Sequence, residues 1–344
     1  MSQFDYIKNI TRFALQNDQK QLKDSVRGLI DYSKKIKKHN FALELQAIVK
    51  ENHTMQAVSG GDHRSYAPLE TGTVQDTDLS DLILEKVSSR YTFDDLISDE
   101  NTKNDLQLLV KEQNSFEFLK KYELPVSNKL FLHGPSGCGK TLAAYVLAGQ
   151  LDRPVYVVNI GAIVSSKLGE TSKNLSKLFR KASRSESILF FDEFDTLGKL
   201  RDYSQDHAEM KRVVNTFLQL FDYLPENVLL IAATNYAHVI DQALLRRFDF
   251  KLELKRPKKK EIELLIRKIL KSGQFETDKV ISLQTLVSKA AGLSYYSVQK
   301  TLIQAVKQSL FDMKSNTTRI KPVVDTRVWQ KMIVQEQEQQ KSLG

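Results

Sequence analysis

A single eight-residue segment near the middle of the chain limits the possible fold more than any other part of the sequence. It fits the pattern G-x-x-x-x-G-K-[ST], and its residues are Gly134, Pro135, Ser136, Gly137, Cys138, Gly139, Lys140 and Thr141. In this pattern the glycines let successive backbone N–H groups turn inward around a polyphosphate. We expect residues 130–133 to form a buried strand before this phosphate loop, and residues 142–151, starting at Leu142, to form a helix after it. A phosphate would then lie at a helix N-terminus, where free N–H groups and the helix dipole favour negative charge. The segment predicts a bound nucleotide.

Four side chains at and beyond this loop have the chemistry that a nucleotide requires. Lys140 can reach the β- and γ-phosphates, and the Thr141 hydroxyl can join the coordination of Mg²⁺. Asp192 and Glu193 follow four large apolar residues at the carboxyl end of an expected strand, where α/β sheets place ligand contacts. Asp192 would hold Mg²⁺, and Glu193 would polarise the water that attacks the γ-phosphate. An acidic turn after a core strand is the plainer alternative, but the phosphate loop upstream favours the catalytic interpretation.

Three further residues are candidates for sensing or stabilising the γ-phosphate. Asn235 ends the next expected strand, where a neutral amide could orient the attacking water; taken alone, it would be a turn-forming asparagine. Arg246 and Arg247 follow residues 241–245. A guanidinium at the γ-phosphate stabilises the charge of the transition state and can accelerate hydrolysis by roughly 10³–10⁵.

The composition is that of a globular protein that remains in a reducing compartment. The 344 residues suffice for about two or three domains, and 41% of them are hydrophobic. No run of about eighteen apolar residues is present, and the polar N-terminus does not resemble a secretion signal. The one cysteine, Cys138, excludes an internal disulfide framework. We therefore expect a cytoplasmic location and no membrane span.

The net charge of +9 leaves a nucleic-acid partner open without favouring it. The basic residues are spread along the chain. The densest run is residues 255–260, directly before an amphipathic helix. We interpret this run as a solvated helix entry rather than a nucleic-acid patch.

Changes in periodicity divide the chain into four parts. Residues 1–54 have apolar residues at three- and four-residue intervals and predict a small helical bundle. Residues 55–80 lose the period and predict a flexible linker. Residues 81–256 should form the ATP-binding α/β domain, and residues 257–344 a helical lid domain with a C-terminal helix.

The alternation of strands and helices after the linker predicts a parallel α/β sheet. A helix is expected over residues 103–122, whereas residues 81–88 fit a strand or a helix start equally well. The strictly alternating residues 248–254 predict a half-exposed edge strand. The other expected strands are residues 155–158, 188–191 and 228–233, and two more helices lie around residues 175–182 and 213–221.

Beyond Pro257 the pattern is purely helical. Helices are predicted at residues 262–270, 283–291 and 295–310, with a last apolar turn at Trp329, Met332 and Ile333. The glutamine- and glutamate-rich residues 335–340 predict a fraying, solvated helix end.

The four ordered motifs GPSGCGKT, ILFFDEFD, IAATN and ALLRRFD resemble those of the AAA+ ATPases. More narrowly, they are similar to the AAA clade with the second region of homology, including katanin, spastin and Vps4-like remodelers and bacterial stand-alone AAA proteins. The resemblance implies a P-loop NTPase fold with a Rossmann-like, parallel five-stranded sheet and a helical lid. It also implies a ring, usually hexameric, in which Arg246 and Arg247 act on the ATP of a neighbour. By the same resemblance, Leu96 and Ile97 belong to the segment that contacts adenine, and Gly292 lies near the nucleotide.

One position departs from the family pattern and bears on function. Residues 166–170 resemble the first pore loop, in which Lys167 stands where the family often has an aromatic residue. An ammonium grips an apolar polypeptide less well than an aromatic ring and would prefer an acidic segment. Whether a polypeptide is threaded therefore stays open.

The leading hypothesis is an ATPase ring, with ATP and Mg²⁺ as cofactors, that remodels or regulates a protein partner. The N-terminal bundle would recruit this partner, and the resemblance to bacterial stand-alone proteins makes a peptidase one candidate. Two alternatives are a DNA-acting AAA+ motor or loader, suggested by the charge of +9 and by Lys167, and a nucleotide-gated assembly switch.

Overall fold

The computed structural model describes Gly28 and residues 69–72, 82–165, 168–184, 186–196, 207–312 and 323–343. The chain divides into two units, Met1–Arg64 and Ser65–Gly344, and all of the described residues except Gly28 belong to the second. The predicted N-terminal bundle lies outside the described residues apart from Gly28, and Lys167 lies outside them as well.

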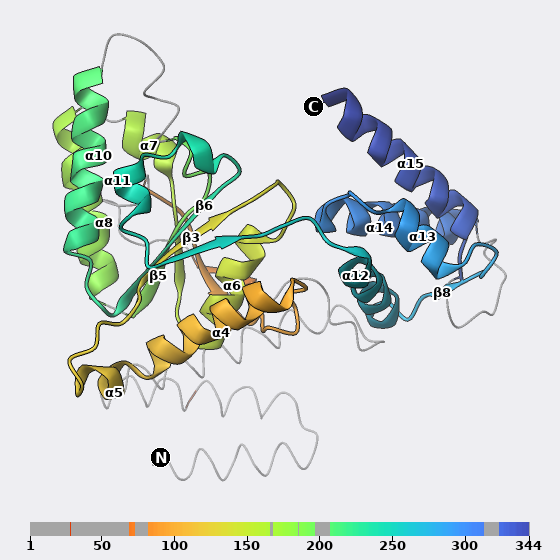
Figure 1. Cartoon of the computed structure of the whole chain (residues 1–344), viewed down its shortest axis with the longest axis horizontal. Helices are drawn as coiled ribbons and strands as arrows, with labels where there is room; N and C mark the ends of the chain where they lie inside the picture. The colour runs from red at the N-terminus through yellow and green to blue at the C-terminus, as the bar shows by residue number, and fades with distance from the viewer. Residues whose placement is uncertain are drawn as a thin grey trace. The chain divides into compact units, whose positions relative to one another are not determined.

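A seven-stranded sheet organises the first part of this second unit (Figure 1). The five strands β3 to β7 run parallel to one another, which confirms the predicted parallel α/β sheet. The spatial order of the seven strands is β1 (Leu69–Gly72), β2 (Ile83–Ser89), β4 (Val155–Val158), β5 (Ser187–Phe191), β6 (Val228–Thr234), β3 (Lys129–His133) and β7 (Phe250–Glu253). The predicted edge strand is β7, which pairs with β3 alone.

Two antiparallel strands extend the sheet beyond the five that were predicted. Residues 81–88 fitted a strand or a helix start equally well, and the structure shows a strand there, β2, which pairs with β4. β1 lies inside the predicted linker, so the linker prediction is wrong for its four residues, all of which pair with β2. The sequence Leu-Glu-Thr-Gly has no clear strand pattern. Residues 69–72 form a strand because their backbone pairs with that of β2, and not because their side chains favour a strand.

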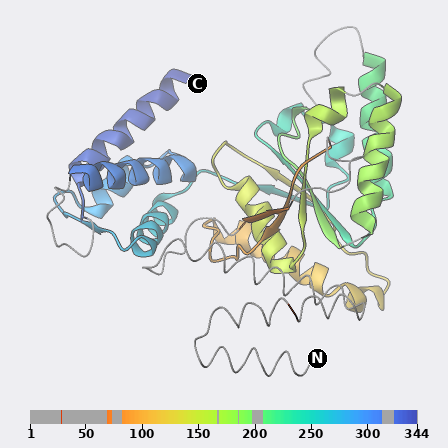
Figure 2. The same cartoon turned by 180° about the vertical axis from the view of Figure 1, so that it is seen from behind.

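Helices cover both faces of the sheet, as Figures 1 and 2 show. In β3, Leu130 and Leu132 pack with one group of helices, while Phe131 between them packs with the other. Strands buried on both faces need such continuous apolar runs. The first group is α4 (Glu100–Asn114) and α6 (Lys140–Leu151), and the second is α7 (Ile160–Ser165), α8 (Leu168–Ser183) and α10 (His207–Asp222). The helix predicted over residues 103–122 is divided at Ser115 into α4 and α5 (Phe116–Lys120).

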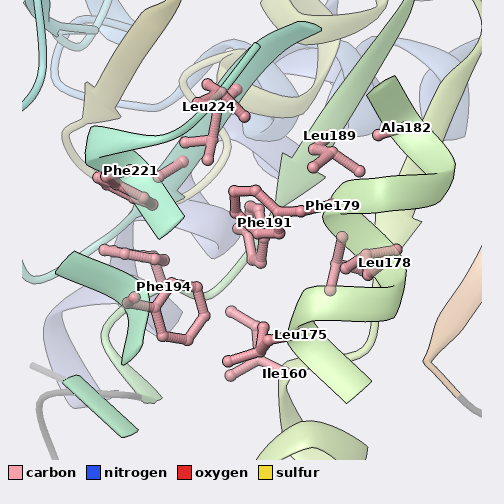
Figure 3. Close-up of a cluster of buried hydrophobic side chains, with 14 of the residues drawn as sticks. Ile160, Leu175, Leu178, Phe179, Ala182, Leu189, Phe191, Phe194, Phe221 and Leu224 are labelled. Atoms are coloured by element: carbon pink, nitrogen blue, oxygen red, sulfur yellow. The ribbon is translucent and has the colours of Figure 1, made fainter. Parts of the chain in front are cut away.

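Aromatic side chains fill the core between β5 and the second group of helices (Figure 3). Phe191 at the end of β5 and Phe194 just beyond it are both fully buried, with ring centroids 6.1 Å apart. Phe217 of α10 contacts both rings edge to face. Such packing fixes the backbone on either side of Asp192 and Glu193.

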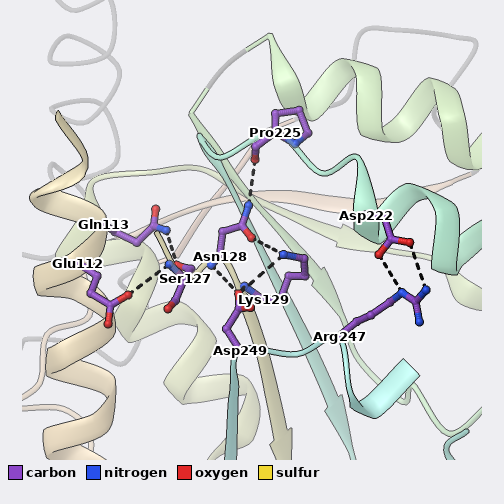
Figure 4. A network of polar contacts seen from close by, with 9 residues as sticks. All are labelled: Glu112, Gln113, Ser127, Asn128, Lys129, Asp222, Pro225, Arg247 and Asp249. Carbon is purple, nitrogen blue, oxygen red and sulfur yellow. Dashed lines mark hydrogen bonds and ion pairs between the residues drawn. The ribbon is translucent and has the colours of Figure 1, made fainter. Parts of the chain in front are cut away.

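A polar network holds the start of β3 (Figure 4). The backbone N–H groups of Asn128 and Lys129 both donate to one carboxylate oxygen of Asp249, each at 2.9 Å. The Asn128 amide also donates to the carbonyl of Pro225 at 3.1 Å. The strand that leads into the phosphate loop is thus tied to the segments that precede its two neighbours, β6 and β7.

The residues after Pro257, predicted to be a lid domain and called the lid below, pack around a hydrophobic core of their own. The helices of the lid are α12 (Lys259–Ser272), α13 (Leu283–Lys289), α14 (Tyr295–Asp312) and α15 (Thr326–Leu343). Trp329 and Ile333 of α15 are fully buried in this core. The lid is not purely helical, because β8 (Glu276–Thr277) and β9 (Val323–Val324) form a short parallel pair.

The predicted fraying of residues 335–340 is also wrong. α15 continues to Leu343, and Glu336, Gln337 and Gln340 make hydrogen bonds to the rest of the lid. Polar composition suggested solvation, but these side chains find partners on α13 and α14 that lie far away in the sequence.

Candidate nucleotide-binding site

The phosphate loop joins the carboxyl end of β3 to the first turn of α6, as predicted. At Gly134 the backbone has φ +136°, and a Cβ there would lie 2.2 Å from the carbonyl oxygen of Leu254. Only glycine fits this close approach. The strand turns directly into the loop, and α6 starts at Lys140. The first N–H groups of α6 therefore face the position expected for a phosphate.

Lys140 lies inside the loop. Its ammonium donates to the carbonyls of Gly134 and Pro135 at 2.8 and 2.9 Å and to the side-chain oxygen of Asn235 at 2.8 Å. Burial lowers the pKa of Lys140, while Cys138 and Asp192 act in the opposite direction. The structure thus brings together two predicted site residues, Lys140 from the loop and Asn235 from the end of β6.

Thr141 and Asp192 form the second pair. The Thr141 hydroxyl donates to a carboxylate oxygen of Asp192 at 3.0 Å. A hydroxyl and a carboxylate side by side are the oxygen ligands that Mg²⁺ prefers. No group of three or more His, Cys, Asp or Glu that could hold a metal occurs among the residues that the structure describes. Thr141 and Asp192 are thus the residues that would hold a Mg²⁺.

Glu193 is exposed and has a left-handed backbone with φ +50°. Such a conformation is strained for a residue with a side chain, and strain of this kind clusters at functional sites. The surrounding contacts hold it in place: the N–H of the buried Phe194 donates to the carbonyl of Ala233 at 2.9 Å.

Two residues that the sequence analysis missed stabilise this edge of the sheet. Asp195, which is buried, accepts a hydrogen bond from the Thr234 hydroxyl at 2.8 Å. The same hydroxyl accepts from the N–H of Tyr236 at 2.9 Å, so it fixes the turn that carries Asn235. In the sequence, the only sign of this contact was the second aspartate of the segment Asp-Glu-Phe-Asp, residues 192–195.

The lid contacts the phosphate loop, but not through Gly292. The N–H of Tyr296 donates to the carbonyl of Gly137 at 3.1 Å, and a Cβ at Gly137 would lie 2.7 Å from the Ser294 hydroxyl. Gly292 is exposed, and its carbonyl accepts from Arg256 at 2.8 Å. The role expected of Gly292 stays a prediction, while Ser294 and Tyr296 are the lid residues in contact with the loop.

The segment expected to contact adenine lies beside the start of α6. Leu96 is buried, and its Cδ1 would lie 3.7 Å from a Cβ placed at Gly139. Ile97, the next residue, is partly buried. Lys268 of α12 reaches this segment, donating to the carbonyl of Asp94 at 2.6 Å and to the Asp95 carboxylate at 3.1 Å. The lid and the segment are therefore linked.

Arg246 and Arg247, the two arginines predicted to act on a neighbour's ATP, lie apart from the contacts around the phosphate loop. Both follow α11 (Gln242–Leu245), the short helix after the 3-10 turn η1 (Ala237–Val239). Arg246 is exposed. Arg247 forms a two-pronged ion pair with Asp222 at the end of α10, at 2.9 and 3.2 Å (Figure 4). The hydrogen bond to Asp222 raises the pKa of Arg247 and lowers that of Asp222.

Sequence comparison identifies the family to which this site belongs. The family described as "ATPase family associated with various cellular activities (AAA)" matches residues 130–256. An uncharacterized AAA family ATPase, y4kL, of Sinorhizobium fredii is 34% identical over 232 residues, which are 64% of this chain and 69% of that protein. The chain belongs to the AAA family of ATPases.

Two other relatives of this AAA ATPase have more specific names. A putative 26S proteasome regulatory subunit homolog of Methanothermobacter thermautotrophicus is 28% identical over 58% of this chain and 54% of that protein. An ATP-dependent zinc metalloprotease FtsH 3 of Sphaerobacter thermophilus is 31% identical over 64% of this chain and 45% of that protein. The chain thus spans only about half the length of these two relatives.

Family membership implies nucleotide binding, and the loop between β3 and α6 lies inside the matched range. In the described part of this AAA ATPase, no helix is both long enough and apolar enough to cross a membrane.

Proposed function

We propose that this AAA ATPase works as a Mg²⁺-dependent homo-oligomeric ring, usually hexameric in the family, that hydrolyses ATP to remodel a protein partner. The observation that carries the proposal is the pairing of predicted site residues at one edge of the sheet. Lys140 contacts Asn235 and Thr141 contacts Asp192, although the first member of each pair lies at the start of α6 and the second follows β6 or β5. Glu193 lies directly beside the second pair.

Each of these residues has a role in hydrolysis. The N–H groups of the loop and the Lys140 ammonium bind the β- and γ-phosphates and neutralise charge that develops on them. Glu193 accepts the proton of the attacking water, and Asn235 orients that water. Thr141 and Asp192 would hold Mg²⁺, which neutralises phosphate charge when bound. Arg246 and Arg247 would act on the nucleotide of a neighbouring subunit, and for this Arg247 has to leave Asp222.

A protein partner is supported by the names of the two longer relatives, a proteasome regulatory subunit homolog and an ATP-dependent metalloprotease. We propose that residues 1–54 recruit this partner, that a peptidase is one candidate for it, and that the complex acts in the cytoplasm. These two names favour a protein partner over the DNA-acting alternative.

The test of the proposal is Glu193→Gln, with Glu226→Gln as the matched control. Both residues are exposed glutamates, and Glu226 lies before β6 at the opposite edge of the sheet. Glu193→Gln should bind ATP, fail to hydrolyse it and elute as a stable oligomer in gel filtration with ATP, while Glu226→Gln should behave as wild type. Elution of the Glu193→Gln protein as a monomer would contradict the ring, and full hydrolysis by it would favour the assembly switch.

A second test addresses the action of Arg247 between subunits. Arg247→Ala should bind ATP but lose hydrolysis, and mixing it with the equally inactive Glu193→Gln should restore part of the turnover, because some interfaces then combine an intact Arg247 with an intact Glu193. Arg267→Ala is the control, because Arg267 also pairs with an exposed carboxylate, that of Glu263 at 2.6 Å, but on the lid. Failure of the mixed oligomers to regain turnover would argue against action between subunits.

A further inference from the structure

The polar end of α15 docks on the first turn of α14. Glu336 accepts a hydrogen bond from the Ser297 hydroxyl and another from the Lys300 ammonium, both at 2.8 Å. The side chain of Glu336 is only 12% exposed. Gln340, one turn later, donates to the same Ser297 hydroxyl at 2.9 Å. The contact is therefore a partly buried, charge-assisted network rather than a surface ion pair.

The same stretch of α15 also holds the end of α13. The amide of Gln337 donates to the carbonyls of Lys289 and Ala291 at 2.6 and 3.4 Å. These carbonyls lie at the C-terminus of α13, where a helix leaves acceptors without a partner in the helix. Glu336 and Gln337 thus hold the turn between α13 and α14 from both sides.

That turn is the part of the lid that contacts the phosphate loop. Ser297 is linked to Ser294, since its N–H donates to the Ser294 hydroxyl at 3.2 Å, and both residues are buried. Ser294 lies against Gly137, and the Tyr296 N–H donates to the Gly137 carbonyl at 3.1 Å. Three consecutive contacts therefore lead from Glu336 to the phosphate loop.

The contact at Gly137 affects a phosphate ligand. Because a trans peptide is planar, the carbonyl of Gly137 and the N–H of Cys138 point in opposite directions. Holding the carbonyl toward Tyr296 turns the Cys138 N–H away from the lid. In a loop of this kind, such N–H groups bind the phosphates.

We infer that Glu336 is a positioning residue for the nucleotide: through Ser297 it fixes the start of α14, and through Tyr296 the orientation of the phosphate loop. This inference rests on the proposed nucleotide site. The C-terminal helix, distant in sequence from that site, thereby sets the affinity for ATP.

The test measures ATP affinity of the full chain by titration calorimetry for wild type, Glu336→Ala and Glu336→Gln. Glu338→Ala is the matched control, because Glu338 is an exposed glutamate on the same helix. Glu336→Ala should weaken ATP binding roughly five- to tenfold, within the usual range of coupling between sites. Glu336→Gln keeps an acceptor for Ser297 and should recover most of the affinity, and Glu338→Ala should bind as wild type.

The fluorescence of Trp329, the single tryptophan, reports whether α15 is docked at the assay temperature. A purely structural role would lower the melting temperature and leave the affinity of the folded protein unchanged. If Glu336→Ala does not fold, Ser297→Ala breaks the same contact from the other side and should weaken binding equally.

Two outcomes are decisive in different ways. Wild type that does not bind ATP contradicts the proposed function. If wild type binds ATP and a folded Glu336→Ala or Ser297→Ala protein has an affinity for ATP within twofold of wild type, the inference about Glu336 is wrong and the proposed function stands.

Discussion

The ammonium of Lys140 and the side-chain oxygen of Asn235 lie 2.8 Å apart, although 95 positions separate them in the sequence. The contact joins the phosphate loop to the end of β6. It places a neutral amide beside the lysine that we propose binds the γ-phosphate.

Replacing Asn235 should therefore affect catalysis more than binding. For Asn235→Ala we expect turnover to fall about tenfold to a hundredfold, because a positioned polar group that acts in the transition state is lost. The affinity for ATP should change less, since the loop N–H groups and Lys140 remain. Steady-state kinetics and calorimetry measure the two quantities, with Asn114→Ala, an exposed asparagine at the end of α4, as control. Equal losses in both would show that Asn235 only binds.

Two aspartates near the start of β3 should differ in their effect on stability. Asp249→Ala removes the acceptor of the N–H groups of Asn128 and Lys129, and Asn128 is buried. Unsatisfied buried groups cost about 1–3 kcal/mol each, so we expect a loss in that range. Asp222→Ala removes only the half-exposed pair with Arg247 and should cost less than about 1 kcal/mol. Urea denaturation of both variants checks the order, and the reverse order would contradict it.

Gly137→Ala should disturb the contact between the lid and the phosphate loop. A Cβ at Gly137 would lie 2.7 Å from the Ser294 hydroxyl and 2.9 Å from the Tyr296 Cβ. The φ of +71° at Gly137 is itself unfavourable for alanine, so the variant should lose about 1–2 kcal/mol through backbone strain. Gly137→Ala should also weaken ATP binding in calorimetry, and an unchanged affinity of the folded variant would argue against the lid contact.

The network at Glu336 should make stability depend on acid. Burial alone would raise the pKa of Glu336, but hydrogen bonds from Lys300 and Ser297 outweigh it, and the pKa is lowered. A carboxyl with a lowered pKa stabilises the folded state above its unfolded pKa of 4.5, and this contribution is lost as the pH falls through the folded pKa. Wild type should therefore exceed Glu336→Gln in stability at pH 7. The difference in the free energy of unfolding should shrink below pH 4.5. Urea denaturation of both proteins at several pH values measures it, and a difference that does not change with pH would contradict the prediction.

Much of the candidate site follows from the sequence because each part is carried by a local pattern. Apolar runs followed by Asp192 or Asn235 place these two side chains at the carboxyl ends of β5 and β6, and the phosphate-loop pattern places Lys140 and Thr141 at the start of α6. Parallel strands bring those ends to one edge of the sheet. The pairs Lys140–Asn235 and Thr141–Asp192 are the result.

Other contacts could not be predicted in this way. The edge strand β1 depends on the backbone of β2, and its own residues give little signal. The partner of Arg247 is Asp222, 25 positions earlier, and composition cannot distinguish this aspartate from a solvated one. The polar end of α15 seemed suited to water for the same reason.

The sequence by itself determined the phosphate-loop pattern, the strands around it and the residues that we propose bind nucleotide, because spacing along one chain encodes them. The tertiary structure decided which polar side chains meet across the fold: Asp195 with Thr234, Asp222 with Arg247, and Glu336 with Ser297. Such pairs form only when packing of separate helices and strands brings the two side chains within a few ångströms of each other. Hydrogen bonds and ion pairs act over that distance, whereas periodicity reports only which side of each element is buried.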